Sequence, residues 1–325
     1  MMKVVSLFSG IGAYEKALNN LGIDIELVNY CELDRVKSKA YSILHNVDID
    51  KNLVDVTSID TSKIDDFDLL VYSPPCQSFS IGGKKLGLSD IRGTLFYNSL
   101  EVIKAKKPKY CVMENVDNLP KKFSSEFADM LKELDKAGYN NYWKVINAKD
   151  FIPQNRARVY VVSIRKDVDK GNFIFPNGND YVKPWYEFIN PYDTRALTNR
   201  QRRMIDIVQG RNTNEEVNVQ GEIQFEQAVI TLRQTGLRFQ NNPEYPTITA
   251  YYGKGGGNFT IMAYKGNIGG ITPRSCFKLM GFDYEDSDLL TSHGFSISSQ
   301  YVMAGDSVCV PVLEGIFRNL FLNNN

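Results

Sequence analysis

The stretch Val4-Val5-Ser6-Leu7-Phe8-Ser9-Gly10-Ile11-Gly12 begins as an apolar run and ends in two glycines. The apolar run is typical of a buried strand, and a helical pattern follows from Ala13 to Asn20. Two glycines at this junction allow a tight turn and a close approach of the backbone to a ligand. The turn lacks the third glycine of a dinucleotide fingerprint, so it does not indicate a pyrophosphate site. A purely structural turn explains the two glycines almost as well.

The same alternation of apolar runs and helical patterns continues through the first half of the chain. Further strands are predicted at residues 25–30, 69–72, 110–113, 143–148 and 159–164. Helical patterns are found at residues 35–44, 94–104 and 124–136. Strands that alternate with helices form βαβ units around a mostly parallel sheet. This half of the sequence therefore predicts an α/β fold.

The pattern changes near residue 178. From there to about residue 270 the chain is richer in Asn, Gln, Gly and Arg, with short β-like runs such as residues 247–252. We interpret this region as a second, smaller and irregular domain. The tail, residues 301–322, has a strand-then-helix pattern that could rejoin the first domain. The predicted domains are therefore 1–178 completed by 299–325, and 179–298.

Composition excludes several classes of protein. Lys+Arg and Asp+Glu are 38 each in 325 residues, so a nucleic-acid footprint would have to be a local patch. The five cysteines are widely spaced and form no C-x-x-C pair, which argues against a disulfide framework and a zinc site. His45 and His293 lack a second ligand type at metal spacing and are expected in surface or loop positions. No apolar run approaches the ~18 residues of a membrane span or resembles a signal peptide, so we expect a cytoplasmic protein.

Cys76 directly follows a predicted buried strand. It lies in the run Ser73-Pro74-Pro75-Cys76-Gln77-Ser78-Phe79-Ser80, and the two prolines rigidify the exit from the strand. Ligands and chemistry collect at the carboxyl ends of strands in open parallel sheets. A thiol there is a candidate nucleophile, and a small buried hydrophobic residue is the alternative.

Three acidic residues follow other predicted strands. Glu32 comes about 20 residues after the glycine turn, where an acid commonly binds ribose hydroxyls. Asp55 follows a strand-like end and could accept a hydrogen bond from an adenine amine. Glu114 follows the strand 110–113 and could act as a general acid if burial keeps it protonated. Each residue also has a simpler alternative. Glu32 could be a solvated carboxylate, Asp55 a loop acid and Glu114 a helix cap.

Gln154, Arg156 and Arg158 alternate at the start of a predicted strand, so their side chains should share one face. Two guanidinium groups on one face suit an anion or a carbonyl-rich ligand. Taken alone, a salt-bridged strand edge explains them at least as well.

In this order, the motifs resemble those of the DNA cytosine-5 methyltransferases along nearly the whole chain. The residues that carry the resemblance are Phe8, Gly10, Gly12, Glu32, Asp55, Pro75-Cys76-Gln77, 92–96, 114–116, Gln154, Arg156, Arg158, 272–282 and 305–308. Only residues 180–265 lack a strong signature, and the family itself diverges there.

The resemblance implies a fold and a reaction. The fold would be a Rossmann-like S-adenosylmethionine-dependent methyltransferase fold with a mostly parallel sheet, plus a smaller irregular β-rich target-recognition domain. The reaction would methylate carbon 5 of a flipped-out cytosine in a specific DNA sequence through a covalent Cys76 adduct. Glu114 would protonate ring nitrogen 3, Arg158 would bind the ring carbonyl oxygen, and Arg156 would help to hold the pocket.

The resemblance also implies a cofactor and partners. The methyl donor would be S-adenosylmethionine, with S-adenosylhomocysteine as product. Its expected binding residues are Phe8, Gly10, Ile11, Gly12, Glu32, Leu33, Asp55, Val56, Pro75, Leu95, Asp306, Ser307 and Val308. The partner would be double-stranded DNA, bound by a monomer of a restriction-modification system or a phage, with no membrane and no metal. Residues 80–89 could close over the base, residues 195–211 carry five arginines that could contact phosphates, and residues 253–258 match a turn near the DNA.

One position departs from the family pattern. Asp306 follows Gly305 where Gly-Asn is usual, and we hypothesise that it assists removal of the carbon 5 proton. Two other functions stay open, a tRNA cytosine-5 methyltransferase and a catalytically silent DNA-binding module. The intact Cys76, Glu114 and Arg158 argue against the silent module.

Overall fold

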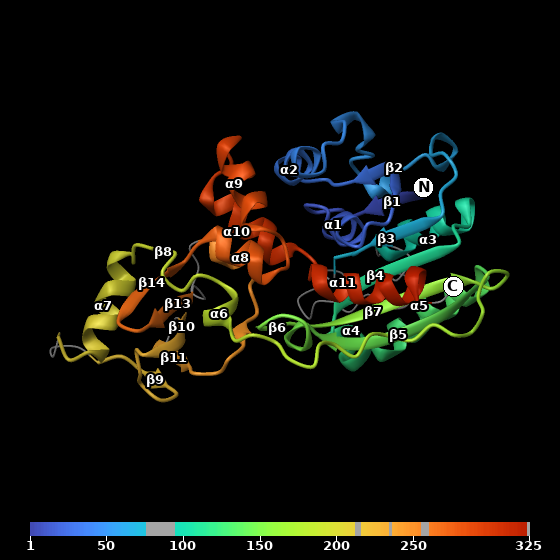
Figure 1. Ribbon diagram of the computed structural model, residues 1–325. Coiled ribbons are helices and arrows are strands. Elements are labelled where there is room, and N and C mark those ends of the chain that lie inside the picture. The colour runs from blue at the N-terminus through green and yellow to red at the C-terminus, as the bar shows by residue number, and fades with distance from the viewer. Residues whose placement is uncertain (76–94, 212–215, 234–235, 255–259, 324–325) are drawn as a thin grey trace, which may run out of the picture. The chain divides into compact units, whose positions relative to one another are not determined.

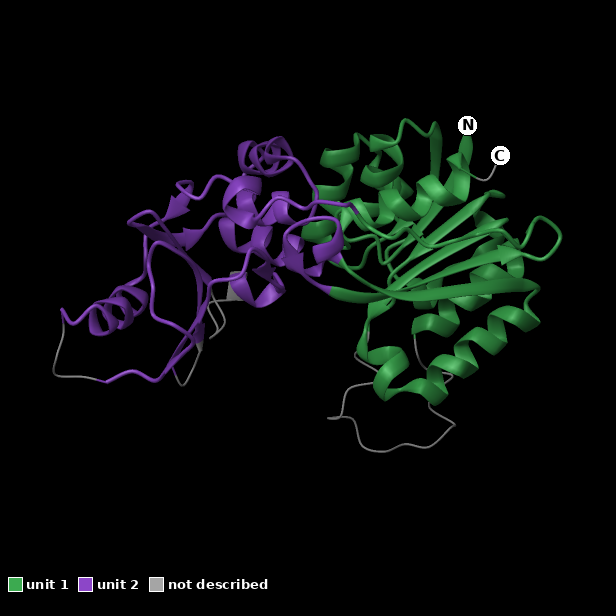
Figure 2. Ribbon diagram, turned by 60° about the horizontal axis from the view of Figure 1, so that its bottom comes forward, with its two compact units in different colours: residues 1–147, 157–178, 308–325 green, residues 148–156, 179–307 purple. Residues whose placement is uncertain are grey.

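A computed structural model describes residues 1–75, 95–211, 216–233, 236–254 and 260–323. The chain folds into two compact units, coloured separately in Figure 2. Unit 1 consists of Met1–Asn147, Ala157–Gly178 and Val308–Asn325, and unit 2 consists of Ala148–Arg156 and Asn179–Ser307. Each unit has its own sheet, and they are described separately below.

Unit 1 is built on a six-stranded sheet with the order β2-β1-β3-β4-β7-β5 (Figure 1). The strands are β1 Met2–Leu7, β2 Ile25–Cys31, β3 Leu69–Tyr72, β4 Tyr110–Val116, β5 Tyr139–Asn147 and β7 Ala157–Arg165. β2, β1, β3 and β4 are parallel, whereas β7 pairs antiparallel with both β4 and β5. All four residues of β3 are buried, as expected for a central parallel strand covered on both faces. The predicted mostly parallel sheet is confirmed.

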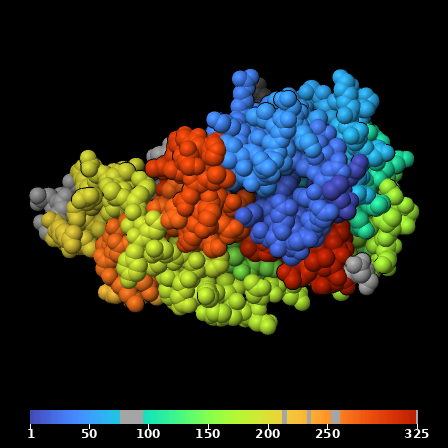
Figure 3. All heavy atoms as spheres, turned by 45° about the horizontal axis from the view of Figure 1, so that its top comes forward, coloured from blue at the N-terminus to red at the C-terminus, as the bar shows by residue number. Residues whose placement is uncertain are grey.

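Helices pack around this sheet. They are α1 Ala13–Asn20, α2 Arg35–His45, α3 Leu95–Lys106, α4 Asn118–Lys122, α5 Ser124–Lys136 and α11 Val310–Phe317, with a π-helical turn at Arg318–Leu322. Side chains of α3 and α5 form one buried cluster with those of β1, β3 and β4. α11 returns from the end of the chain to lie beside α1, so the blue and red ends adjoin in Figure 3. There Asn20 Nδ2 donates to Glu314 Oε1 at 2.6 Å, and the rings of Tyr14 and Phe317 are 6.4 Å apart.

The structure corrects two predictions made for the first domain. β4 continues to Val116, so Glu114 lies within the strand rather than after it, because β7 pairs with β4 as far as Val116 and Arg158. The tail contains no strand among its described residues. It forms α10 Ile297–Asp306 and α11 instead, because Ser296 caps α10 and its apolar residues are buried as a helical face.

Unit 2 contains the second six-stranded sheet, ordered β8-β14-β13-β10-β11-β9. Its strands are β8 Thr194–Arg195, β9 Val219–Gln220, β10 Gln227–Arg233, β11 Gly236–Gln240, β13 Thr260–Tyr264 and β14 Asn267–Ile271, and β6 Gln154–Asn155 pairs separately with β12 Tyr245–Pro246. Its helices are α6 Trp185–Phe188, α7 Asn199–Val208, α8 Pro273–Leu279, α9 Tyr284–Ser292 and α10. Residues 250–254 form a 3₁₀ helix, so the predicted β-like run at 247–252 is wrong there.

The boundaries of the compact units coincide with the predicted domains at residue 178 and differ elsewhere. Residues 148–156 group with unit 2, because β6 pairs with β12. Residues 299–307 also group with unit 2, since the Gln300 side chain accepts from Ser287 and Tyr301 donates to the Ile271 carbonyl.

Within the described residues, no helix is long and apolar enough to cross a membrane. The same residues contain no group of three or more His, Cys, Asp or Glu side chains that could hold a metal ion.

Candidate active site

The turn after β1 is left-handed at three positions. Phe8, Gly10 and Gly12 have φ values of 55°, 57° and 79°. The buried Ser9 hydroxyl fixes the turn, because its Oγ donates to the Ser6 carbonyl at 3.0 Å and accepts from the Cys31 amide at 3.2 Å. The backbone therefore enters α1 through a rigid turn at the carboxyl end of β1.

His45 packs directly against this turn. Its Nε2 donates to the Ile11 carbonyl at 2.9 Å, and a Cβ on Gly12 would lie 2.0 Å from the same Nε2 atom. Tyr41, 4.8 Å away between ring centroids, supports the imidazole from within α2. The prediction of a surface or loop position for His45 is therefore wrong, because the contact depends on α2 folding back onto the turn.

Replacing Gly12 by Ala should lower the free energy of unfolding by about 2 kcal/mol or more. The left-handed φ costs an L-residue about 1–2 kcal/mol, and the new Cβ must also displace His45. Gly22→Ala is the matched control, because Gly22 has φ 67° and no atom within 4 Å of the added Cβ. Urea unfolding of both variants measures the difference. Equal losses in the two variants would show that the His45 contact is not restrictive.

Glu32 connects the end of β2 to the glycine turn. Its Oε2 accepts from the Gly10 amide at 2.9 Å, and its Oε1 accepts from the Asp34 amide at 2.8 Å. The Asn52 side chain holds the backbone of Glu32 through two hydrogen bonds of 3.0 Å. Asn52 Oδ1 accepts from the Glu32 amide, and Asn52 Nδ2 donates to the Glu32 carbonyl. The sequence gives no signal for Asn52, which lies in no recognisable motif. Burial raises the pKa of Glu32 above its ordinary value, although the two amides oppose this.

Glu32→Gln should alter the pH dependence of stability. With its pKa raised, Glu32 holds its proton more tightly in the folded state, so its contribution is greatest below about pH 4 and is lost as pH rises through the raised value. Urea titrations of both proteins measure this contribution as the difference in free energy of unfolding, unmutated protein minus variant. This difference should become smaller as the pH rises from about 4 toward 7. Glu133→Gln is the control with opposite sign, because Lys136 lowers the pKa of Glu133. A difference independent of pH would refute the assignment.

Two further predicted cofactor residues, Leu33 and Asp55, follow β2 in the chain. Leu33 is 67% exposed, and Asp55 caps the 3₁₀ helix Val56–Ser58 by accepting from the Thr57 amide at 2.9 Å. The Thr57 amide and hydroxyl lower the pKa of Asp55. The expectation that Asp55 ends a strand is wrong, because only Asn52 in this region pairs with β2, through an isolated bridge to Tyr30.

Glu114 and Arg158 form an ion pair between neighbouring strands. Arg158 Nε lies 3.2 Å from Glu114 Oε1, and Glu114 is only 8% exposed. Next to Glu114, Asn115 Nδ2 donates to the Pro74 carbonyl at 2.9 Å. The structure thus brings Glu114, the predicted acid, and Arg158, the predicted carbonyl-binding residue, to the end of the sheet where β3 leads into residues 73–75. Cys76 and residues 80–89 lie outside the described residues.

Gln154 and Arg156 bind backbone atoms of unit 2. Arg156 donates to the carbonyls of Ile248, Gly305 and Ser307, at 3.0, 3.2 and 2.7 Å, and Gln154 Oε1 accepts from the Ile248 amide. Gln154 and Arg156 therefore share partners, as their alternation predicts, whereas Arg158 belongs to β7 and pairs with Glu114.

The remaining predicted cofactor residues are divided between the units. Phe8 and Leu95 pack against the core of unit 1, Pro75 is exposed, and Val308 begins the last segment of unit 1. Asp306 ends α10 in unit 2, and Ser307 is its C-cap.

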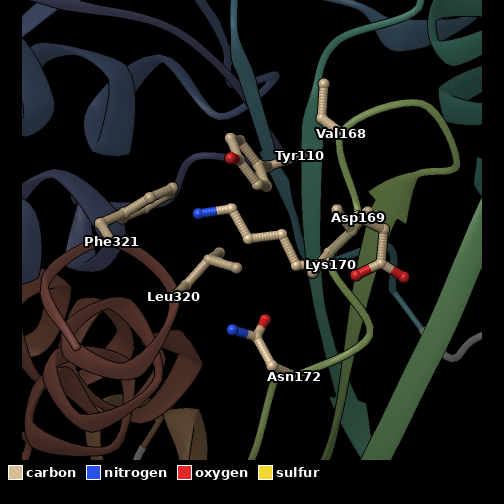
Figure 4. A pocket seen from close by; sticks show the side chains of 8 residues that line it. Tyr110, Val168, Asp169, Lys170, Asn172, Leu320 and Phe321 are labelled. Carbon is tan, nitrogen blue, oxygen red and sulfur yellow. The ribbon is translucent and has the colours of Figure 1, made fainter. Parts of the chain in front are cut away.

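A separate pocket of about 120 Å³ lies at the other end of β4 (Figure 4). Tyr110 begins β4 whereas Glu114 is near its end, and Leu320 and Phe321 line the pocket from the C-terminal turn. The Lys170 side chain points among these apolar groups. The pocket contains none of the predicted site residues and lies apart from the ion pair.

Comparison with known proteins agrees with this geometry. Residues 2–322 match the family model described as C-5 cytosine-specific DNA methylase. The chain therefore belongs to this family and is a DNA (cytosine-5-)-methyltransferase.

Similar curated proteins come from bacteria and phages. The type II methyltransferase M.Bsp6I of Bacillus sp. (strain RFL6) is 32% identical, covering 99% of both chains. M.HhaI of Haemophilus parahaemolyticus is 31% identical, covering 98% of this chain and 94% of its own. The orphan methyltransferase M.SPRI of Bacillus phage SPR is 29% identical, covering 98% and 97%.

Solved structures show the same fold. The S. pombe Dnmt2 methyltransferase has a TM-score of 0.67 at 18% identity and full coverage of both chains. A putative DNA modification methyltransferase encoded within an E. coli prophage has a TM-score of 0.67 at 17% identity, also with full coverage. The Rossmann-like methyltransferase fold predicted from the sequence is thereby confirmed.

Proposed function

We propose that this enzyme methylates carbon 5 of a flipped-out cytosine in a specific duplex DNA sequence, with Cys76 adding covalently to carbon 6. The buried Glu114–Arg158 pair is the observation that supports the proposal most directly. It lies at the strand edge from which the backbone leads through Pro74 and Pro75 to Cys76.

The residues have complementary roles in this reaction. Addition of the Cys76 thiolate to carbon 6 sends electrons toward ring nitrogen 3, and Glu114, which takes up a proton when the bound cytosine separates it from Arg158, delivers that proton to the nitrogen. Arg158 donates to the ring carbonyl oxygen and keeps the ring oriented. Carbon 5 then has enamine character and takes the methyl group. A base removes the carbon 5 proton, Cys76 is eliminated as a thiolate, and ring nitrogen 3 returns its proton to Glu114. Asp306 is our candidate to assist that proton removal.

S-adenosylmethionine supplies the electrophilic methyl group when bound. The residues around the glycine turn fit it, because there is open space where a side chain on Gly10 would be and Glu32 is fixed beside the turn. The Glu32 carboxylate suits ribose hydroxyls, and the exposed Leu33 offers an apolar surface for adenine. S-adenosylhomocysteine is the expected product.

Unit 2 is our candidate for target recognition. α7 buries Ile205 against its sheet and exposes three arginines, Arg200, Arg202 and Arg203. Guanidinium groups on one exposed helix suit DNA phosphates, which makes binding depend on salt. Sequence would be read by other side chains in the grooves.

Methyl incorporation tests this function. The purified protein, labelled S-adenosylmethionine and duplex DNA from a host without cytosine methylation should give labelled 5-methylcytosine. Sequencing the methylated positions should show one recurring sequence. Label in tRNA but not in duplex DNA would reassign the substrate, and label in neither would indicate the silent module. A covalent complex on 5-fluorocytosine DNA tests the Cys76 step separately.

A further inference from the structure

Tyr14 places a buried hydroxyl between two parts of unit 1. It is the second residue of α1, immediately after the glycine turn, and is 3% exposed. Its hydroxyl donates to the Tyr72 carbonyl at 3.2 Å and lies 2.9 Å from Ser73 Oγ. A hydroxyl has one proton, so the Ser73 hydroxyl is the donor in the second bond. Two hydrogen bonds thus tie the start of α1 to the end of β3.

The segment held by Tyr14 leads directly to the proposed nucleophile. Tyr72 ends β3, and Ser73 and Pro74 follow it. Asn115 holds the Pro74 carbonyl from β4, so buried side chains from α1 and β4 hold two carbonyls of the short segment from Tyr72 to Pro74. Burial raises the pKa of Tyr14, and the charge of Glu114 raises it further, so the hydroxyl stays protonated and lies near the proposed acid.

We propose that Tyr14 is a positioning residue, which ties the first turn of the cofactor-binding helix to Tyr72 and Ser73 and thereby sets the backbone that leads to Cys76. The inference rests on the proposed function and deepens it. The Tyr14 ring also contacts Phe317 of α11, so the hydroxyl can be removed while the ring keeps its packing. Misplacement of about 1 Å can cost on the order of 100-fold in rate, so loss of these bonds should be visible in kinetics.

Tyr14→Phe tests the role of the hydroxyl. We expect kcat and the rate of adduct formation on 5-fluorocytosine DNA to fall about 10-fold. The KM for S-adenosylmethionine should change less than about twofold, because the turn keeps its backbone and Glu32 keeps its contacts. If the substitution only destabilised the protein, a smaller fraction of the molecules would be folded and active. The folded molecules would still form the adduct at the normal rate.

Tyr139→Phe is the matched control. Tyr139 is also fully buried, and its hydroxyl donates to the Pro108 carbonyl at 2.7 Å, but it begins β5 and contacts none of residues 72–74 through a described hydrogen bond. The Tyr139→Phe variant also loses one buried hydroxyl, and it should keep the kcat, KM and adduct rate of the unmutated protein. Equal kinetics of Tyr14→Phe and Tyr139→Phe would overturn the inference.

Ser73 provides a second variant if Tyr14→Phe does not fold. Ser73→Ala should slow adduct formation, and Ser73→Thr should restore it by keeping a hydroxyl. Tyr14→Phe should slow it further in Ser73→Ala, because it also removes the bond to the Tyr72 carbonyl. Normal adduct rates in Ser73→Ala would also overturn the inference. An unmutated protein that methylates no DNA would instead contradict the proposed function, so the two failures are distinguishable.

Discussion

Cys76→Ala should abolish methyl transfer to DNA, lowering the rate by at least about 1,000-fold, because the variant has no thiolate to add to carbon 6. The other four cysteines cannot replace it. Cys31, Cys111, Cys276 and Cys309 are each at most 2% exposed. Burial raises the pKa of Cys31 to about 12 and also raises that of Cys111, so neither forms a thiolate near neutral pH. Labelled-methyl incorporation and gel detection of the 5-fluorocytosine adduct should both be negative.

The control is Cys276→Ala, which removes a buried thiol from α8 in unit 2. It should keep methyl transfer and adduct formation. Cys76→Ala should still bind S-adenosylmethionine in a calorimetric titration, since the turn and Glu32 are unchanged. A Cys76→Ala protein with more than about a tenth of normal activity would show that catalysis does not pass through this thiol.

Local signals predicted much of unit 1. The bounds of α1, β3 and α5 agree with the sequence predictions, because glycines or prolines stand near their ends. The glycine turn and Glu32 are both predicted to bind the cofactor, and the Gly10 amide bonds the Glu32 carboxylate. These features depend on nearby residues and on the shared edge of parallel strands.

Contacts between distant segments could not be predicted in the same way. The extension of β4 through Glu114 depends on pairing with β7, more than forty residues later. His45 and Asn52 carry no motif, and their roles arise because α2 and the loop after it fold back onto the turn and β2. The tail was misread because the apolar residues of a buried helix and of a short strand look alike over a few positions.

Glu114→Gln should lower the rate of methyl transfer by about 100-fold or more, the usual range for loss of a general acid. Gln has nearly the shape of Glu and can still accept a hydrogen bond from Arg158, but it has no proton to give to ring nitrogen 3. Without that proton, negative charge builds up on the ring as the thiolate adds, so adduct formation on 5-fluorocytosine DNA should slow with methyl transfer. Glu133→Gln, which breaks an exposed pair with Lys136 on α5, should keep both rates.

Stability separates this chemical effect from a structural one. In Glu114→Gln, Arg158 loses its carboxylate partner. Because the pair is buried, weakening it should lower the free energy of unfolding by about 1–3 kcal/mol. Arg158→Lys weakens the same pair but leaves the carboxyl group, so it should destabilise the protein similarly while slowing the reaction less than Glu114→Gln does. If Glu114→Gln destabilises the protein but leaves adduct formation at the normal rate, Glu114 acts by holding Arg158 rather than by delivering a proton. Rapid-quench measurement of the adduct, together with urea unfolding of the same samples, decides between the two roles.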